Sequence, residues 1–253
     1  MKFYLVGGAV RDELLHRPVQ DHDIVVFGAD ETTFMQRFPN AIKVGKRTGV
    51  YIVQGVEYTL SPARSIREDL ETRDLTINAM ARDNEGKIIS RPQALDDLTR
   101  GILRPVAAAN FVDDPLRAIR AARFAAWFPD FTVHPDLIRA MELVGRSNLL
   151  ADVAAERVGN EVIKAGRGPR PGRFLELLTR TGLLAPWFLE LHRADTVPAG
   201  PPPYHTGSLL DHIATVMNRA APDPDLVWMA LCHDLGKAGT DPGQWPRHHH
   251  HEH

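Results

Sequence analysis

The sequence has little of the features that would place it in a specialised class of protein. Its 253 residues include one cysteine, Cys232, so no disulfide can form within the chain, and we expect a reducing, cytoplasmic location. No apolar run approaches the roughly 18 residues of a membrane span. The first residues enter a strand pattern directly, which argues against a signal peptide or a membrane partner. A hydrophobic content of 43% and a net charge of −2 are typical of a globular protein.

Positive charge is concentrated in the middle of the chain although the total charge is balanced. Residues 115–175 contain ten arginines or lysines but six acids. A local basic surface matters more to a polyanionic partner than the net charge does. The excess favours nucleic-acid binding, but solvated helix faces would produce the same pattern.

The periodicity of apolar residues changes near residue 110. Short β-branched or aromatic segments predict strands at 3–6, 24–27, 51–53, 58–60 and 88–90, and helices at 9–15, 31–38 and 75–81. Beyond residue 113 strand signals vanish, and the pattern predicts helices at 116–128, 135–144, 155–165, 172–181, 209–219 and 225–235. The glycines at 145, 166 and 182 are plausible helix stops.

These patterns predict an α+β protein in three parts. We expect a mixed-sheet head at 1–110, an all-α neck and body at 111–197, and a further helical region at 198–253. The last part begins with a proline-rich linker at 198–204.

The first motif combines a glycine turn with paired carboxylates. Gly7 and Gly8 follow the first predicted strand, and Asp21 and Asp23 open the second. Side chains two apart in a strand share a face, so the two carboxylates lie side by side. A glycine turn at a helix N-terminus, with Arg11 nearby, can hold phosphate, and the carboxylates can hold a divalent metal. Together they predict metal-assisted phosphoryl or nucleotidyl transfer, whereas either half alone would favour an ordinary capped turn.

A second motif surrounds the predicted helix at 75–81. Asp74 can cap this helix, and Arg73 can reach a phosphate or a ribose. Asn78 can bond a sugar hydroxyl or tie down the backbone. By itself the segment indicates a capped helix and no more.

A third motif places arginines on a helix that starts near Asp114. Arg117, Arg120 and Arg123 recur every three residues and so form a stripe on one helical face. A carboxylate and a guanidinium held together can hydrogen-bond the edge of a base. An exposed arginine face with an N-cap would give the same pattern.

The order of these motifs resembles the class II tRNA nucleotidyltransferases, the bacterial CCA-adding family of the DNA polymerase β superfamily. The matching segments are GGAVRD at 7–12 with the Asp-x-Asp pair, RDLTINAM at 73–80, DDPLRAIRAAR at 113–123 and AERVGNE at 155–161. The resemblance implies a template-independent enzyme that adds CCA, or only CC, to the tRNA 3′ end from CTP and ATP with Mg²⁺. Its helical body would bind the tRNA acceptor arm.

The resemblance also implies a role for each motif residue. Asp21 and Asp23 would bind Mg²⁺ and be catalytic, and Asp114 and Arg117 would read the base. The other nucleotide contacts would come from Gly8, Arg11, Arg73, Arg120 and Arg123. The last motif, at 155–161, would buttress the helices of the neck.

One departure from the family pattern bears on the product. The segment at 61–72 is shorter than the flexible loop of CCA-adding members, and in the family a shortened loop accompanies enzymes that add only CC. Full CCA addition and CC-only addition therefore both stay open. A poly(A) polymerase shares the motifs and is the nearest rival, whereas a non-catalytic RNA-binding relic would not need Asp21 and Asp23.

The C-terminal region contains a candidate second metal site. Adjacent His233 and Asp234, with His212 one helix upstream, form a metal-ligand set. They resemble the HD phosphohydrolase domain attached to some family members, but the later aspartate of that domain does not follow. We expect a partial HD region with at most a weak second divalent metal, and a metal-dependent phosphohydrolase as an alternative function. The histidines from His248 either continue this region or are a purification tag, and nothing here indicates the oligomeric state.

Overall fold

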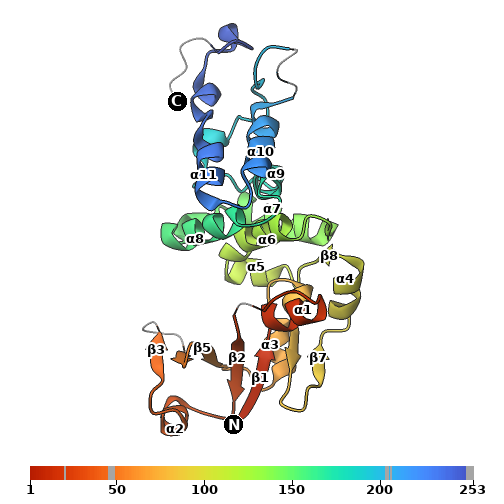
Figure 1. The fold of residues 1–253 in the computed structure, drawn as a ribbon, viewed down its shortest axis with the longest axis vertical. Helices are drawn as coiled ribbons and strands as arrows, with labels where there is room; N and C mark the ends of the chain where they lie inside the picture. The colour runs from red at the N-terminus through yellow and green to blue at the C-terminus, as the bar shows by residue number, and fades with distance from the viewer. Residues whose placement is uncertain (20, 45–48, 203–204, 206, 249–253) are drawn as a thin grey trace. The chain divides into compact units, whose positions relative to one another are not determined.

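The computed structural model describes residues 1–19, 21–44, 49–202, 205 and 207–248. The chain divides into two compact units, Met1–Asn110 and Phe111–His253 (Figure 1). Residues 203 and 204 of the predicted linker lie outside the described residues, as do residues 249–253 of the terminal histidine run.

The first unit contains a seven-stranded mixed sheet with the order β3-β4-β5-β2-β1-β6-β7. β2 and β5 run parallel, and the other neighbouring strands are antiparallel. The strands are β1 (Lys2–Val6), β2 (Asp23–Phe27), β3 (Ile42–Val44), β4 (Val50–Val53), β5 (Val56–Leu60), β6 (Met80–Arg82) and β7 (Ile88–Ser90), followed by β8 (Ile102–Leu103). The helices are α1 (Gly8–Leu14), α2 (Glu31–Arg37), α3 (Ile66–Glu71), the 3₁₀ turn η1 (Thr76–Asn78) and α4 (Ala94–Arg100). The predicted mixed-sheet head is confirmed.

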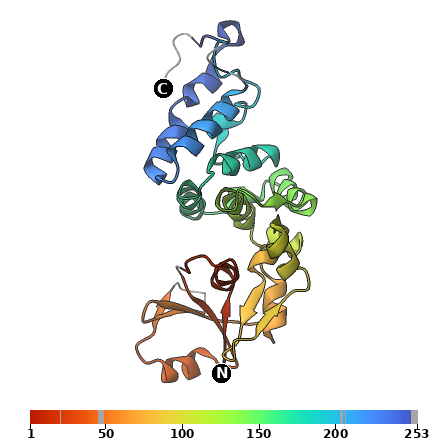
Figure 2. The ribbon, with the colours of Figure 1, turned by 45° about the vertical axis from the view of Figure 1, so that its right-hand side comes forward.

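The alternation of side chains along β2 buries both faces of the sheet. Val25 belongs to a core cluster with Ile66 of α3. Val26 belongs to a second cluster with Phe34 of α2, the orange helix near the N-terminus label in Figure 2. Because side chains two apart share a face, Asp23 lies on the α3 side of the sheet. The central strand is therefore fixed by packing on both sides.

Side-chain caps begin two helices of the first unit. Asp30 accepts a hydrogen bond from the Thr33 amide at 2.8 Å and starts α2. Ser65 accepts one from the Glu68 amide at 3.3 Å and starts α3. Such caps satisfy amide groups that have no partner inside the helix.

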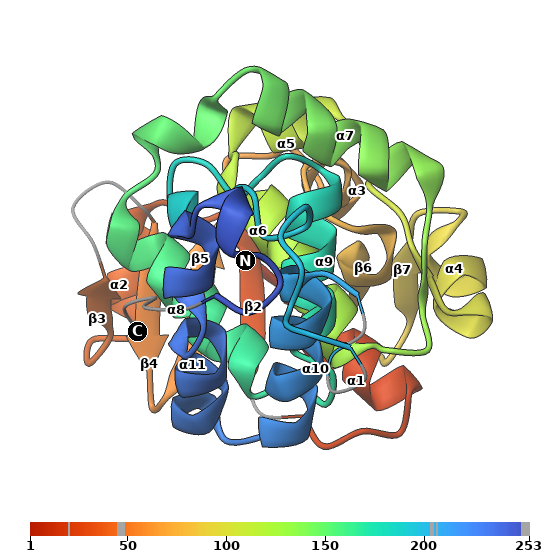
Figure 3. The same ribbon diagram turned by 90° about the horizontal axis from the view of Figure 1, so that it is seen from above.

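The second unit is helical, as the sequence predicts. Its helices are α6 (Leu116–Trp127), α7 (Pro135–Arg146), α8 (Ala155–Gly166), α9 (Gly172–Arg180), α10 (Leu209–Ala220) and α11 (Pro224–Cys232), preceded by α5 (Ala109–Asp113). The short elements are β9 (Thr132–Val133), η2 (Leu149–Asp152), η3 (Leu189–Leu191), η4 (Leu235–Gly239) and η5 (Pro242–Gln244). α6 packs against α8 and α9, and α10 lies beside α11 (Figures 1 and 3).

Three details of the sequence prediction are wrong. Residues 75–81 are not a helix: they form η1 and then enter β6, where Ala81 pairs with Val6 of β1. Strand pairing across the sheet overrides the local helical pattern here. Gly145 does not stop α7, which continues to Arg146; instead a Cβ at 145 would come within 2.9 Å of the Thr181 carbonyl oxygen. The helix predicted at 225–235 ends at Cys232 and becomes η4.

Candidate functional site

Three carboxylates gather where β2 begins. Asp21 precedes β2, Asp23 is its first residue, and Glu57 of the parallel strand β5 is the register partner of Asp23. Partial burial raises the pKa of Glu57, and the negative charges of Asp23 and Asp21 raise it further. Carboxylate oxygens are the ligands that Mg²⁺ prefers. This edge of the sheet therefore has the donors that suit a hard divalent cation.

Sequence reasoning missed Glu57. Its segment alternates apolar and polar residues like any half-buried strand, and 33 positions separate Glu57 from the second aspartate. The parallel pairing of β2 with β5 is what brings Glu57 beside Asp23. The strand predicted at 58–60 begins one residue after Glu57, whereas β5 begins at Val56, so a search confined to the predicted strands would not have found it.

The glycine turn is attached to the second motif through the backbone. Gly7 has φ 66°, a conformation that side chains with a Cβ rarely adopt. Its amide donates to the Met80 carbonyl oxygen at 3.0 Å, and Gly8 then opens α1. The turn ends β1 and directs the first amides of α1 away from the strand, the arrangement that holds phosphate in many proteins.

Arg11, a predicted nucleotide contact, is 8% exposed and engaged inside the first unit. Its Nε and Nη2 donate to the two carboxylate oxygens of Asp12, each at 2.9 Å. Its Nη1 donates to Oδ1 of Asn78 at 2.6 Å. A Cβ on Gly8 would come within 3.4 Å of Arg11 Nη2, so the guanidinium lies against the glycine turn.

Arg73 lies on the other side of the same turn. A Cβ on Gly7 would come within 3.7 Å of Arg73 Nη1. Asp69 of α3 accepts hydrogen bonds from Arg73 Nη2 at 2.7 Å and Nε at 3.1 Å, and Ser61 donates to Asp69 at 2.9 Å. The structure thus brings Gly8, Arg11 and Arg73 together, as the sequence predicts.

Asp74 does not cap a helix, in contrast to the sequence expectation. Its Oδ1 accepts from the Leu75 amide at 2.8 Å and from Asn78 Nδ2 at 3.0 Å, and the residue is 4% exposed. The buried η1 turn replaces the predicted helix, so there is no run of free amides for Asp74 to cap.

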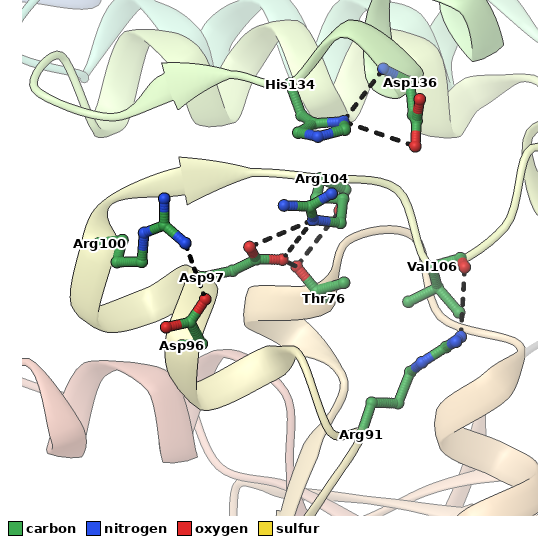
Figure 4. Close-up of polar contacts among 9 residues, drawn as sticks. All are labelled: Thr76, Arg91, Asp96, Asp97, Arg100, Arg104, Val106, His134 and Asp136. Atoms are coloured by element: carbon green, nitrogen blue, oxygen red, sulfur yellow. Dashed lines mark hydrogen bonds and ion pairs between the residues drawn. The ribbon is translucent and has the colours of Figure 1, made fainter.

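The buried Asp97 carboxylate contacts Thr76 of η1 (Figure 4). Asp97 of α4 is 1% exposed and accepts a hydrogen bond from Thr76 Oγ1 at 2.7 Å. Arg104 Nε donates to the same carboxylate at 2.9 Å, and the Thr76 amide donates to the Arg104 carbonyl at 2.9 Å. A buried carboxylate paired in this way holds its segment firmly.

The predicted base-reading residues lie on α6 of the second unit and just before it. Asp114 accepts from Arg157 of α8, with Arg157 Nη2 at 3.2 Å from both carboxylate oxygens. Along α6, Arg117, Arg120 and Arg123 are half-buried while the positions between them are buried. The burial pattern confirms the predicted stripe of arginines.

Arg123 is tied to the last motif. Its Nε donates to Glu161 Oε2 at 2.5 Å, and Glu161 is 5% exposed. Its guanidinium also lies over the Phe124 ring, 4.2 Å from the centroid. One ion pair, Arg123–Glu161, therefore joins α6 to α8, and a second, Arg157–Asp114, joins α8 to the residue that precedes α6 by two positions.

A second cluster of ligands lies between α10 and α11. His212 Nε2 is 3.2 Å from His233 Nε2, and Asp234 Oδ2 is 3.3 Å and 3.2 Å from these two nitrogens. Among the described residues, this is the group whose three ligand atoms all lie within 4.8 Å of one another. Asp21, Asp23 and Glu57 are more widely spaced.

The electrostatics of this cluster favour ligands ready to bind a metal. Burial lowers the pKa of His212, and the neighbouring positive groups lower it further against the opposing effect of Asp234. His233 Nδ1 is 2.7 Å from the Ala230 carbonyl oxygen, which can only accept, so Nδ1 carries the proton and Nε2 faces the cluster. Despite burial, which opposes it, the hydrogen bond and charge of Lys237 hold the pKa of Asp234 below its usual range.

The described part of the chain contains no helix with both the length and the apolar character that a bilayer span requires. Two family models match the sequence. The "Poly A polymerase head domain" matches residues 3–59 and 46–104. The "Probable RNA and SrmB- binding site of polymerase A" matches residues 130–195.

Curated relatives and solved structures agree with these models. The "Multifunctional CCA protein" of Stenotrophomonas maltophilia strain R551-3 is 39% identical over all of this chain, which covers 68% of that protein. That of Nitrosococcus oceani is 36% identical, with 99% of this chain and 66% of the relative covered. The CCA-adding enzyme of Bacillus stearothermophilus, solved in complex with CTP, has a TM-score of 0.72 and 34% identity over 92% of this chain. This chain spans 58% of that structure's chain. The chain therefore belongs to the CCA-adding family of nucleotidyltransferases.

Proposed function

We propose that this chain adds nucleotides to the 3′ end of tRNA, using CTP and ATP. The observation that carries the proposal is the 39% identity to a multifunctional CCA protein over the whole of this chain. The gathered carboxylates and the glycine turn support the same chemistry, because nucleotidyl transfer needs held metals and held phosphates more than covalent catalysis.

Each group of residues has a place in this reaction. Asp21 and Asp23 would hold Mg²⁺ with Glu57 as a third carboxylate, and this metal would neutralise charge that develops on the phosphates. Gly8 and Arg73, beside the turn, would contact the triphosphate. In the second unit, Asp114 and Arg117 would read the base, with Arg120 and Arg123 completing the nucleotide site.

The test is incorporation of labelled nucleotides into tRNA that lacks its last three residues. We expect transfer of CMP in the presence of Mg²⁺, and loss of transfer in the Asp21→Ala variant. Elongation by AMP alone, without any need for CTP, would instead identify a poly(A) polymerase.

CC-only addition is a second candidate, and one observation favours it. The segment at 61–72 contains the helix α3 (Ile66–Glu71), which is capped by Ser65 and buries Ile66 and Leu70 in the core. Asp69 of this helix is bound by both Ser61 and Arg73. A pinned helix cannot reshape the nucleotide pocket between CTP and ATP as a flexible loop would. An assay on tRNA that ends in CC, with ATP, separates the two candidates.

We also propose a transition-metal site at His212, His233 and Asp234. Two imidazoles and a carboxylate form a ligand set that suits Zn²⁺, Mn²⁺ or Co²⁺. A metal here would serve hydrolysis of phosphate esters. Equilibrium dialysis with Co²⁺, followed by its absorption spectrum, tests binding, and the His233→Ala variant should lose it.

A further inference from the structure

We propose that Asn78 is a positioning residue that holds the Arg11 guanidinium beneath the glycine turn, and so fixes the part of the site that receives the triphosphate. This inference rests on the proposed nucleotide binding. It assigns to Asn78 neither of the two roles expected from the sequence, a sugar contact or a backbone tie.

The contacts of Asn78 are internal and directional. Its Oδ1 accepts from Arg11 Nη1 at 2.6 Å, and its Nδ2 donates to Asp74 Oδ1 at 3.0 Å. Asn78 is 5% exposed, so its amide is turned into the protein and away from a ligand. Both polar atoms of the side chain are used in bridging the first motif to the second.

The arginine is held on two sides. The Asp12 carboxylate accepts hydrogen bonds from Arg11 Nε and Nη2, and Asn78 Oδ1 accepts one from Arg11 Nη1. Asp12 is the next residue on the same helix, so this pair cannot locate the guanidinium relative to the rest of the unit. Asn78 comes from 67 positions away, and its hydrogen bond ties the guanidinium to the second motif.

The position of this guanidinium matters to the turn. A Cβ on Gly8 would be 3.4 Å from Arg11 Nη2, so the guanidinium lies beside the open face of Gly8. In the same segment as Asn78, the Met80 carbonyl oxygen accepts a hydrogen bond from the Gly7 amide. The Gly7–Met80 backbone bond and the Asn78–Arg11 bond both join the first motif to the second, and removing the Asn78 amide takes away a contact that keeps the guanidinium in its place beside Gly8.

The experiment compares Asn78→Ala with two control variants in the full chain. Thr76→Val removes the Thr76 bond to Asp97 in the same 3₁₀ turn but leaves the Arg11 bridge intact. Asn84→Ala removes an exposed asparagine of the same unit. Binding of CTP and ATP is measured by equilibrium dialysis, thermal unfolding by calorimetry, and the Arg11 Nε–H signal by NMR.

We expect Asn78→Ala to weaken binding of both CTP and ATP by about tenfold, a loss typical of one hydrogen bond to a charged group. The ratio of the two affinities should not change. Thr76→Val should lower the melting temperature without weakening binding, and Asn84→Ala should change neither. In the Arg11→Ala background, Asn78→Ala should cause no further loss, because the two residues act as one unit.

The possible results distinguish failure of this inference from failure of the proposed function. Unchanged CTP affinity and an unchanged Arg11 signal in Asn78→Ala overturn the inference, as do effects of Arg11→Ala and Asn78→Ala that multiply. A wild-type protein that binds no nucleotide contradicts the proposed function. If Asn78→Ala still speeds exchange of the Arg11 signal in that protein, while Thr76→Val does not, the positioning role of Asn78 is supported.

Discussion

Individual side chains carry the chemistry proposed here, and Glu57 is the one that only the fold reveals. Its raised pKa reports partial burial and the charges of Asp23 and Asp21. Three acids that repel one another are costly unless a cation joins them. Their proximity at the start of β2 is therefore the strongest sign of a metal site in the first unit.

Replacing Glu57 should impair metal use more than folding. We expect Glu57→Gln to lower nucleotide transfer by about 10- to 100-fold, the range typical of residues that support a metal site. Raising the Mg²⁺ concentration should restore part of this loss. Glu85→Gln, at an exposed turn of the same unit, is the control. Equal activity of the two variants over a Mg²⁺ titration would remove Glu57 from the site.

Arg117 should govern the choice of nucleotide. We expect Arg117→Ala to reduce discrimination between CTP and UTP by at least about tenfold, because one good base-edge contact supplies roughly 1–3 kcal/mol. Single-turnover rates with each nucleotide measure this ratio. Arg139→Ala on α7, an exposed arginine paired with Asp136, is the matched control. Selectivity that stays at the wild-type value would count against base reading by Arg117.

The elements show which parts of the fold are predictable from sequence and which are not. The strand at 88–90 and the helices from 116 onward have clear local periodicity, and the structure confirms their existence but moves the ends of the helices predicted at 135–144 and 225–235. The segment at 75–81 has the local pattern of a helix, but β6 gains its hydrogen bonds from β1, 75 positions away at the Val6–Ala81 pair. Pairing of this kind leaves no trace in a short window of sequence.

The same limit applies to the candidate sites. Asp21, Asp23 and the arginine stripe follow from spacing within one element. The Asn78 bridge, the partner of Asp114 and the third carboxylate depend on contacts between distant segments. Sequence reasoning therefore identifies the residues of single motifs, and the fold supplies the residues that hold them.

The ion pair between α6 and α8 should matter for stability. Glu161 is buried, so removing its charge leaves Arg123 without its partner at 2.5 Å. We expect Glu161→Gln to lower the free energy of unfolding by about 3 kcal/mol. Glu142→Gln, which breaks an exposed pair with Arg146 on α7, should cost less than about 1 kcal/mol. Urea denaturation measures the free energy of unfolding of both variants. Equal decreases would show that the buried α6–α8 ion pair contributes no more to stability than the exposed pair on α7.

The histidine cluster between α10 and α11 should make stability depend on pH. Burial lowers the pKa of His212 from 6.5, so below that value the unfolded chain binds more protons than the folded one. Stability is then highest above that pH and falls as the solution is acidified. In metal-free buffer, the melting temperature of the wild type should drop more between about pH 7 and pH 5 than that of His212→Gln. Parallel curves for the two proteins would refute this origin.

At the scale of the whole molecule, the two units divide the proposed work. The first unit contains the carboxylates and the glycine turn, and the second contains the arginine stripe and the model match to an RNA-binding site. In the proposed reaction the first set would hold the metal and the triphosphate, and the second set would read the base. This division explains why the motifs are spread over the chain.

Product length is also a property of the whole molecule. If the segment at 61–72, which contains α3, restrains the nucleotide pocket, the chain should extend tRNA by two C residues and fail on tRNA that ends in CC. Replacing the segment with a longer, glycine-rich loop should then permit addition of A. Addition of A by the unaltered chain would show that the pinned helix does not limit the pocket.

The most direct measurement is the 3′-terminal sequence of tRNA that lacks its last three residues, after incubation with CTP, ATP and Mg²⁺. The 3′-terminal sequences of the tRNA products are compared between the wild type and the Asp21→Ala variant. With the wild type we predict tRNA ends extended by two successive C residues. With the variant we predict unextended ends. Unextended tRNA with the wild type, or equal extension by both proteins, would contradict nucleotidyl transfer at this site.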